Sequence, residues 1–302
     1  MRLFKNAHYD FLGIRRRAYI FSAALILMGG FFLFVHHGLH YGVDFTGGTL
    51  MQVRFDSATS VGAVRGAISG LSGGEAQIQQ FGTSNEYVIR LPSFQATSQK
   101  DVGEDLRNAL TGTFGKDYQV VRTEAVGPKV GNELQRKALE AILIAFGLTL
   151  IYLAFRFEWR FGVAAVVATA HDIIITFGFI SAFNVDITLA TVAAVLTIVG
   201  YSLNDTIIVF DRMRENFKGK RKEEYVQTLN RSINETLPRT ILTSGTTLAT
   251  LIALFIFGGD VIRPFALVLI LGIGIGTFSS IFVASPVLLE IENWYRRREA
   301  SA

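Results

Sequence analysis

The chain alternates between long apolar runs and polar stretches. Its long apolar runs approach or exceed the roughly 20 residues that a helix needs to cross the hydrocarbon core of a bilayer. These runs are residues 18–35, 138–155, 161–183, 187–210, 241–257 and 265–289. The pattern predicts an α-helical polytopic membrane protein with six transmembrane helices, surrounded by the lipid bilayer.

The polar stretch 38–137 follows the first apolar run and, at about 100 residues, is long enough to fold as a small domain. Strand-like and helix-like patterns follow one another within it. Strands are expected at 49–55, 76–81, 87–91 and 118–126, and helices at 61–71 and 100–110. This is the order of the ferredoxin-like βαββαβ fold, so we expect an α+β domain with two helices on one face of a four-stranded antiparallel sheet.

These segments divide the chain into three parts. Residues 1–37 hold the N-terminus and the first helix, residues 38–137 form the ferredoxin-like domain, and residues 138–302 hold helices two to six. The first apolar run follows a basic segment, as in a secretory signal peptide, but no small-x-small cleavage pattern comes after it. We therefore interpret this run as an uncleaved signal anchor.

Basic residues lie at alternate helix ends and outnumber acidic residues, for a formal net charge of +4. They include Arg15, Arg16, Arg17, Arg156, Arg160, several residues within 212–231, and residues 296–298. Because such residues collect on the cytoplasmic side, we expect both termini in the cytoplasm and the domain 38–137 in the periplasm. A nucleic-acid partner is not expected, since the charge does not gather on one surface.

The segment 211–238 mixes charged residues with apolar ones such as Phe217, Leu229 and Ile233. This amphipathic pattern predicts a cytoplasmic helix that lies on the membrane surface. Pro238 is expected to mark the turn into the fifth transmembrane helix, because proline disfavours a helix interior.

Ionisable residues within the predicted spans are the strongest functional candidates, because each is costly in lipid unless it faces protein or water. Asp205 lies in the fourth span, and Arg239 begins the fifth at a similar membrane depth. An antiparallel helix pair could bring them together as a proton-coupling pair. The alternatives are a static polar clamp for Asp205 and a topology anchor for Arg239.

His171 and Asp172 form a second polar pair, halfway along the third span. A histidine beside a carboxylate could take part in proton transfer, or the two groups could simply satisfy each other. The chain has no cysteine, which excludes disulfides and thiolate metal sites. No metal site is predicted from the other residues.

Smaller polar residues accompany these groups. In the fourth and fifth spans they are Ser202, Asn204, Thr240, Thr243 and Ser244, for which helix packing is the commoner explanation. Two glycine-containing connectors flank the domain 38–137 and contain Gly42, Asp44, Gly47, Gly48, Gly127, Pro128 and Gly131. Glycines there permit tight turns, and the connectors lack the strand and helix context of a phosphate-binding loop.

Five motifs in this order resemble those of the SecF family, part of the SecD/SecF group in the resistance-nodulation-division (RND) superfamily. The motifs lie at 42–48, 126–131, 170–172, 200–212 and 239–244, so the resemblance covers essentially the whole chain. The run 200–212, with Asn204 and Asp205, is the most specific of them.

The resemblance implies a subunit that pairs with SecD into a twelve-helix unit in the bacterial inner membrane. Such a unit assists the SecYEG channel, with YajC and YidC as further partners, and promotes export of unfolded preproteins. By the same resemblance, Asp205 and Arg239 are the coupling pair. Protons are the coupling ion, no other cofactor is expected, and the subunit is not an enzyme.

Three other functions remain open from the residues alone. An RND exporter subunit for small molecules or lipids would usually carry twice as many helices. An intramembrane hydrolase could use Ser202 or His171, but no G-x-S-x-G motif surrounds Ser202. A passive assembly scaffold would use the polar residues only to clamp helices together.

Overall fold

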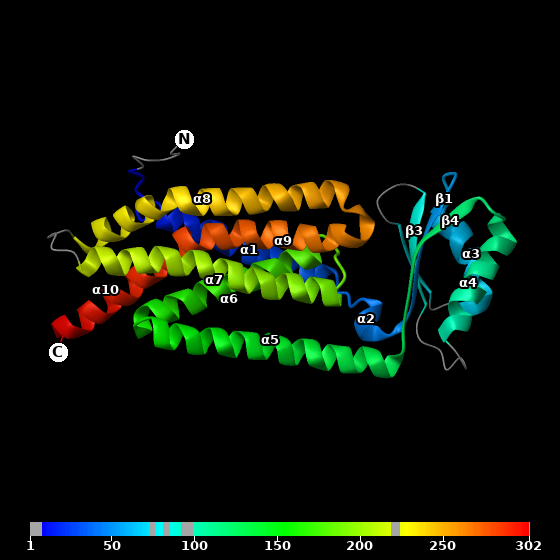
Figure 1. Ribbon diagram of the computed structural model, residues 1–302, viewed down its shortest axis with the longest axis horizontal. Helices are drawn as coiled ribbons and strands as arrows, with labels where there is room; N and C mark the ends of the chain where they lie inside the picture. The colour runs from blue at the N-terminus through cyan, green and yellow to red at the C-terminus, as the bar shows by residue number, and fades with distance from the viewer. Residues whose placement is uncertain (1–7, 73–75, 81–84, 92–98, 219–223, 302) are drawn as a thin grey trace. The chain divides into compact units, whose positions relative to one another are not determined.

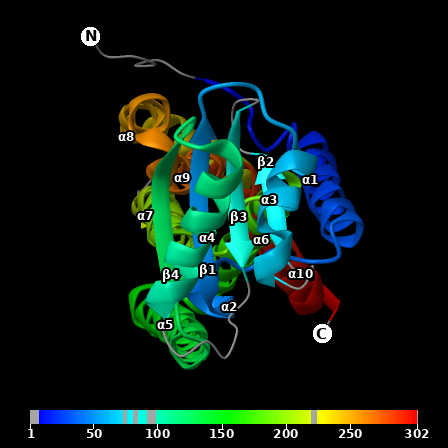
Figure 2. The ribbon, with the colours of Figure 1, turned by 90° about the vertical axis from the view of Figure 1, so that its right-hand side faces the viewer.

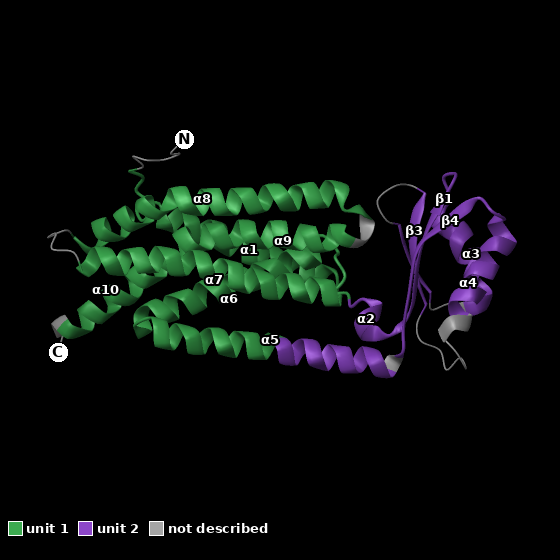
Figure 3. Ribbon diagram, in the orientation of Figure 1, with its two compact units in different colours: residues 1–40, 142–302 green, residues 41–141 purple. Residues whose placement is uncertain are grey.

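The structure is a computed structural model that describes residues 8–72, 76–80, 85–91, 99–218 and 224–301. It divides into two compact units (Figure 3). The helical unit comprises Met1–His40 and Ile142–Ala302, and the α/β unit comprises Tyr41–Ala141. The sequence-based limits for the second unit were 38 and 137.

The helical unit is a bundle of long apolar helices (Figure 1). They are α1 (Arg15–Val35), α5 (Pro128–Arg156, whose first half belongs to the α/β unit), α6 (Trp159–Ala182), α7 (Leu189–Lys218), α8 (Tyr225–Phe257) and α9 (Gly259–Ser279). A π-helical turn, η1 (Ser280–Ala284), joins α9 to α10 (Ser285–Ser301). Counting α9 to α10 as one span, six helices in the described chain could cross a membrane by length and composition, which confirms the predicted number.

The segment 211–238 differs from the prediction. Its described residues continue α7 as far as Lys218 and then form the beginning of α8, so no separate surface helix exists there, and 219–223 lie outside the described residues. Pro238 lies inside α8 and does not mark a turn. Figure 1 shows α8 bending toward its N-terminal, yellow end.

Packing accounts for this difference. Leu229, Ile233 and Leu237 of α8 are buried in one apolar cluster with Phe210 and Met213 of α7. Burial of an aliphatic side chain contributes about 1.5–3 kcal/mol, so three of them outweigh the cost of about 3 kcal/mol for a proline within a helix. Tertiary contacts therefore extend the helix through Pro238.

Ion pairs tie together the end of the bundle that carries most of the arginines. Arg15 in α1 pairs with Glu290 in α10 at 3.4 Å, so the first and last helices meet at this end. Arg156 pairs with Asp211 at 2.5 Å, and further pairs are Arg160 with Glu292 and Arg212 with Glu235. Four pairs of helices are thus joined by ion pairs at the same end.

The α/β unit has the predicted order of strands and helices. The elements are the short helix α2 (Val43–Thr46), β1 (Gly48–Phe55), α3 (Val61–Ser72), β2 (Gln77–Gln80), β3 (Glu86–Leu91), α4 (Gln99–Phe114) and β4 (Tyr118–Val126). The strands form one antiparallel sheet in the order β2-β3-β1-β4. Because β3 lies between β1 and β2, this is a split βαβ arrangement, as in ferredoxin-like folds. Phe81, the predicted end of the second strand, lies outside the described residues.

Alternation along the strands determines which face the helices cover. Met51 and Val53 of β1 and Ile89 of β3 are buried in one cluster with Val64 of α3 and Leu106 of α4. Both helices therefore pack on one face, and Figure 2 shows them in front of the same side of the sheet. The other face carries the buried apolar residues Leu50 and Val88 as well as polar groups. Among the polar groups, Glu86 accepts hydrogen bonds from Gln52 and Arg54.

Candidate functional site

Asp205 is buried in the middle of the helical unit and is held by hydroxyl groups. Thr240 of α8 donates a hydrogen bond of 3.0 Å to its Oδ1 atom. Ser280, the first residue of the π-helical turn, donates one of 3.2 Å to its Oδ2 atom. Asp205 belongs to α7, so its carboxylate joins three segments of the bundle.

Asp172 of α6 forms a similar centre. Its Oδ2 atom accepts hydrogen bonds from Ser202 of α7 at 2.5 Å and from Ser279 of α9 at 2.6 Å. Its Oδ1 atom lies 2.9 Å from Nδ1 of His171. The ring of His171 is buried, and its Nε2 atom has no hydrogen-bond partner in the described chain. The third and fourth spans are thus joined through a carboxylate that sequence analysis treated only as half of a local pair.

Close helix packing brings these groups together. A side chain at Gly276 of α9 would meet Ser202 of α7 at 3.0 Å, and one at Gly272 would meet Ile198 at 2.1 Å. Glycine at these two positions therefore lets α9 lie against α7, which places Ser279 and Ser280 beside the two carboxylates. Figure 1 shows α7 and α9 running side by side.

Arg239 does not pair with Asp205. Among the described residues, no ion pair within 4.0 Å joins the two side chains, and the Arg239 side chain is exposed on the surface of the single chain. Its neighbour Thr240 instead reaches Asp205. The residue of α8 that contacts Asp205 is therefore the one that follows Arg239, and not Arg239 itself.

The remaining polar candidates of the spans separate into inner and outer groups. Ser202 and Thr240 bind the two carboxylates, and buried Ser244 accepts a hydrogen bond of 2.8 Å from Thr277 of α9. By contrast, Asn204 and Thr243 are exposed, and the Thr243 hydroxyl bonds to carbonyls of its own helix. Polarity in the sequence could not separate these two groups.

The arrangement does not form a hydrolytic triad. In such a triad, the serine hydroxyl bonds to the histidine, and the histidine bonds to the carboxylate. Here Ser202 donates directly to Asp172, while His171 contacts the other oxygen of the same carboxylate. The histidine is therefore not placed to accept the serine proton, which counts against the hydrolase alternative.

The two glycine connectors meet within the α/β unit. Gly42 precedes α2, which contains Asp44, and Gly47 and Gly48 then adopt positive φ angles of 70° and 112°. Pro128 begins α5, and the N–H of Gly131 donates to the carbonyl of Gly127 at 2.9 Å. A side chain on Gly131 would lie 3.0 Å from the backbone of Gly47 and of Phe45. The two motifs therefore form one tight backbone junction beside β1.

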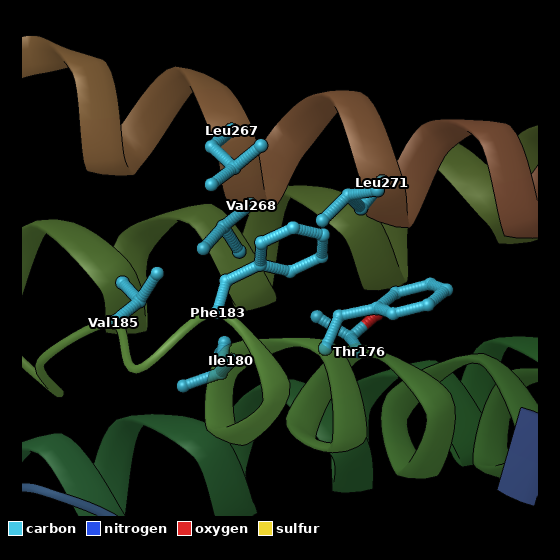
Figure 4. A pocket seen from close by; sticks show the side chains of 8 residues that line it. Thr176, Ile180, Phe183, Val185, Leu267, Val268 and Leu271 are labelled. Carbon is cyan, nitrogen blue, oxygen red and sulfur yellow. The ribbon is translucent and has the colours of Figure 1, made fainter. Parts of the chain in front are cut away.

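An apolar crevice lies between α6 and α9 (Figure 4). Its lining residues are Thr176, Phe179, Ile180, Phe183, Val185, Leu267, Val268 and Leu271. About 180 Å³ of empty space is present, but the crevice is too narrow for a water molecule. Small-molecule sites usually enclose about 300 Å³ or more, so this crevice is smaller than such a site.

Sequence analysis missed the two serines that contact the carboxylates from α9 and η1. Ser279 and Ser280 are common polar residues in an apolar helix, where hydroxyls readily bond to their own backbone. The one available signal was their position next to each other in a span that also carries closely spaced glycines. In the described residues, no group of three or more His, Cys, Asp or Glu side chains could hold a metal ion.

Comparison with known families matches two parts of the chain. Residues 106–294 match the model of the C-terminal region of the protein export membrane proteins SecD/SecF. Residues 32–59 match the model of the SecD/SecF GG motif, which includes the glycine connector at 42–48. The first match covers α5 to α10, with both buried carboxylates.

Curated relatives match over nearly the full length. The protein translocase subunit SecF of Gemmatimonas aurantiaca is 47% identical, covering 100% of this chain and 92% of the relative. The SecF subunit of Vibrio alginolyticus is 44% identical, covering 91% of this chain and 87% of the relative. The similarity therefore extends across both units.

A solved structure has the same fold. The crystal structure of SecDF, a translocon-associated membrane protein from Thermus thermophilus, superposes with a TM-score of 0.86 at 39% identity and covers 97% of this chain. This chain spans 40% of that SecDF chain. The chain belongs to the SecD/SecF protein-export family, as one of its SecF members.

Proposed function

We propose that this SecF chain uses the proton motive force to promote movement of preproteins through the SecYEG channel, together with SecD. The observation that carries the proposal is Asp205, a buried carboxylate bound by hydroxyls from α8 and η1 and by no cation in the described chain. A carboxylate so held can gain or lose a proton without breaking an ion pair, and its partners lie on separate helices. Protonation there can therefore change helix packing.

The energy of a proton is sufficient for such a change. At about 200 mV a proton carries about 4.6 kcal/mol, because each 100 mV is worth about 2.3 kcal/mol per elementary charge. Since about 1.4 kcal/mol changes an equilibrium tenfold, this energy can shift a two-state bundle more than a thousandfold. No cofactor other than the proton is required.

The exposure of Arg239 supports SecD as the partner. An arginine in a spanning helix is costly in lipid, so an exposed one calls for protein or water beside it. Asn204 and Thr243 are also exposed on the adjoining helices α7 and α8. A second membrane subunit that covers these three residues would remove the cost and place Arg239 in protein surroundings.

Localisation follows from the charges. The arginine-rich end of the bundle fits the cytoplasmic side of a bacterial inner membrane, which leaves the α/β unit in the periplasm. From there the α/β unit can contact unfolded preprotein as it leaves SecYEG. YajC and YidC are further candidate partners of the same assembly, by family resemblance alone.

A passive scaffold is the competing function, and one observation favours it. Both oxygens of Asp205 already accept hydroxyl hydrogen bonds, so the group could hold α7, α8 and η1 together without changing its charge. A scaffold and a proton-driven subunit differ in one respect. Only the second needs an ionisable side chain at position 205.

The deciding experiment measures preprotein accumulation in cells depleted of their own SecF. The cells receive the wild-type chain, Asp205→Asn, or the control Asp105→Asn, which changes an exposed carboxylate of α4, at equal membrane levels. We expect the wild type and the control to clear precursors, and Asp205→Asn to leave them. Equal clearance by all three would overturn proton coupling at Asp205 and favour the scaffold.

A further inference from the structure

The two buried carboxylates are connected through adjacent residues of one backbone. Ser279, the last residue of α9, donates to Asp172, and Ser280, the first residue of the π-helical turn, donates to Asp205. Each of the four side chains is buried. A movement of this single peptide therefore alters the hydrogen bonds of both carboxylates.

Each of these serines has two acceptors for its one hydroxyl hydrogen. The Ser279 oxygen lies 2.6 Å from Oδ2 of Asp172 and 3.1 Å from the carbonyl of Gly276. The Ser280 oxygen lies 3.2 Å from Oδ2 of Asp205 and 3.0 Å from the carbonyl of Thr277. A hydroxyl donates one hydrogen bond at a time, so it points either to the carboxylate or to the helix backbone.

Protonation of a carboxylate decides between these two positions. When the carboxylate binds a proton, its new O–H group can donate to the serine oxygen, and the serine hydrogen then turns to the helix carbonyl. The proton is delivered by a hydronium ion of the surrounding water, whose O–H bond breaks as the O–H bond of the carboxyl group forms. The serine thus changes from hydrogen-bond donor to hydrogen-bond acceptor toward the aspartate. The hydrogen bonds between the serine hydroxyls and the backbone of α9 therefore depend on whether the carboxylates are protonated.

The backbone at this point is suited to movement. A π-helical turn has one extra residue in its hydrogen-bonded ring, and such turns are frequent at functional sites. Here the hydroxyl of Ser285 donates to the carbonyl of Ser280 at 3.0 Å, which satisfies a backbone group at the irregular turn. Ser280 is therefore bonded through its side chain to Asp205 and through its carbonyl to the beginning of α10.

The groups that contact Asp172 are those expected around a carboxylate that binds and releases a proton. They do not include a strong base that would hold it as a permanent ion pair. Two hydroxyls and His171 surround it, and no arginine or lysine pairs with it in the described chain. The Nε2 atom of His171 is also buried and has no hydrogen-bond partner within the part of the chain that the structure describes. The charged group acting on Asp205 from α8 is Arg239, which lies beyond ion-pair distance.

We propose that Asp172 is a second proton-binding carboxylate of the transport cycle, coupled to Asp205 through Ser279 and Ser280. This proposal rests on the proton-driven function proposed above and extends it. The coupling runs through the peptide that carries both serines, because the two carboxylates share no direct bond. Ser279 and Ser280 are then positioning residues, and Asp172 and Asp205 are the groups that bind the proton.

Infrared difference spectroscopy of the full chain in lipid vesicles tests the proposal, because the carboxyl C=O band reports protonation directly. We expect one carboxyl band from Asp172 and one from Asp205, and both should disappear as the pH rises. Asp172→Asn should remove one band and shift the other, and Asp205→Asn should do the reverse. The double variant Ser279→Ala with Ser280→Ala should keep two bands, and adding either Asn substitution to it should no longer shift the remaining band.

Controls separate coupling from misfolding. Ser22→Ala removes a buried hydroxyl that has no hydrogen-bond partner among the described residues, and it should leave both bands unchanged. Ser279→Thr keeps a hydroxyl and should retain the mutual shift. The inference is overturned if Asp172→Asn leaves the spectrum unchanged. It is also overturned if Asp172→Asn does not shift the Asp205 band.

Export assays on the same variants distinguish the two proposals. If the Asp172 band is absent while Asp205→Asn still blocks export, the inference fails and the proposed function stands. If both bands are present and coupled but neither Asn variant affects export, the two carboxylates bind protons together, but their part in the transport cycle and the proposed function are both overturned. If both Asn variants lose export and the two bands are coupled, the result supports the inference about Asp172 and the proposed function.

Discussion

The hydroxyl of Thr240 donates a hydrogen bond of 3.0 Å to Oδ1 of Asp205 and thereby joins α8 to α7 inside the bundle. Arg239 precedes Thr240 in the chain but is exposed. One turn of α8 thus presents a hydroxyl to the interior carboxylate and a cation to the surface. Successive residues of an α-helix point about 100° apart, so only a large rotation of α8 would bring Arg239 to the place that Thr240 occupies beside Asp205.

Replacement of Thr240 by valine tests the interior half of this relationship. Valine has nearly the same shape but no hydroxyl, so Oδ1 of Asp205 loses its donor. We expect a loss of about 1–2 kcal/mol in stability, because hydrogen bonds between membrane helices are modest, together with slower clearance of preproteins. Thermal unfolding in detergent and the depletion assay measure the two effects.

Thr250→Val is the matched control for that variant. Thr250 is exposed in the same helix, and its hydroxyl bonds to the carbonyl of Thr246. It should behave like the wild type in both measurements. Equal export by Thr240→Val and Thr250→Val would show that the bond between α8 and Asp205 has no part in function.

The elements of the α/β unit could be predicted because apolar and polar residues alternate over parts of its strands, most regularly in β4. The two carboxylates could be found because ionisable groups are rare in apolar helices. Ser279 and Ser280 could not be found in this way. Serine is ordinary in a membrane helix, and a π-helical turn has no local sequence signal. Their role comes from the packing of α9 on α7, which only the three-dimensional structure reveals.

For Pro238, the sequence did give a local signal, but the prediction made from it was wrong. Its local preference was interpreted as a helix boundary, but Leu237 and Ile233 are buried against α7, and that packing overrides the preference. For Arg239, sequence position predicted a place near Asp205, and its neighbour Thr240 does contact Asp205, but the direction of the Arg239 side chain could not be predicted. The direction of the Arg239 side chain depends on how α8 is rotated about its axis, and packing against the neighbouring helices determines that rotation.

Arg239→Gln should affect assembly more than folding. The side chain forms no ion pair in the described chain and is exposed, so its loss should change the unfolding temperature of the isolated chain very little. We expect less SecD to co-purify with the variant and export to decrease. Arg65→Gln, which removes an exposed arginine of α3, serves as the control. Normal SecD recovery and normal export with Arg239→Gln would rule out both roles.

Gly131→Leu tests the junction of the two glycine motifs. A Cβ atom there would lie 3.0 Å from backbone atoms of Gly47 and Phe45, which is a steric clash. A side chain could relieve such a clash by changing its rotamer, but the backbone cannot. Overpacking of this kind costs about 1–3 kcal/mol. Gly147→Leu in the same helix meets nothing within 4 Å and should be tolerated. Hydrogen exchange of β1 should increase in the first variant only, and equal protection in both would contradict the tight junction.

Gly29→Leu tests the contact between α1 and α6. A Cβ atom on Gly29 would lie 2.8 Å from the Cα atom of Gly178, so the helices would have to separate. We expect lower thermal stability and weaker protection of α1, whereas the neighbouring Gly30→Leu, which meets nothing within 4 Å, should be neutral. Similar unfolding temperatures for the two variants would show that α1 does not depend on this close approach.

Cysteine labelling tests the orientation of the chain in the membrane. Because the sequence contains no cysteine, a single introduced thiol gives an unambiguous signal. Asp105 of α4 and Glu299 of α10 are both exposed, and they belong to different units. The arginine-rich end, near Glu299, is expected in the cytoplasm, because basic residues resist transfer across the membrane. A membrane-impermeant maleimide added to intact cells should therefore label Asp105→Cys and should reach Glu299→Cys only after the inner membrane is opened. The reverse pattern would place the α/β unit in the cytoplasm, where it could not contact a preprotein emerging from the channel, and the proposed mode of assistance would then fail.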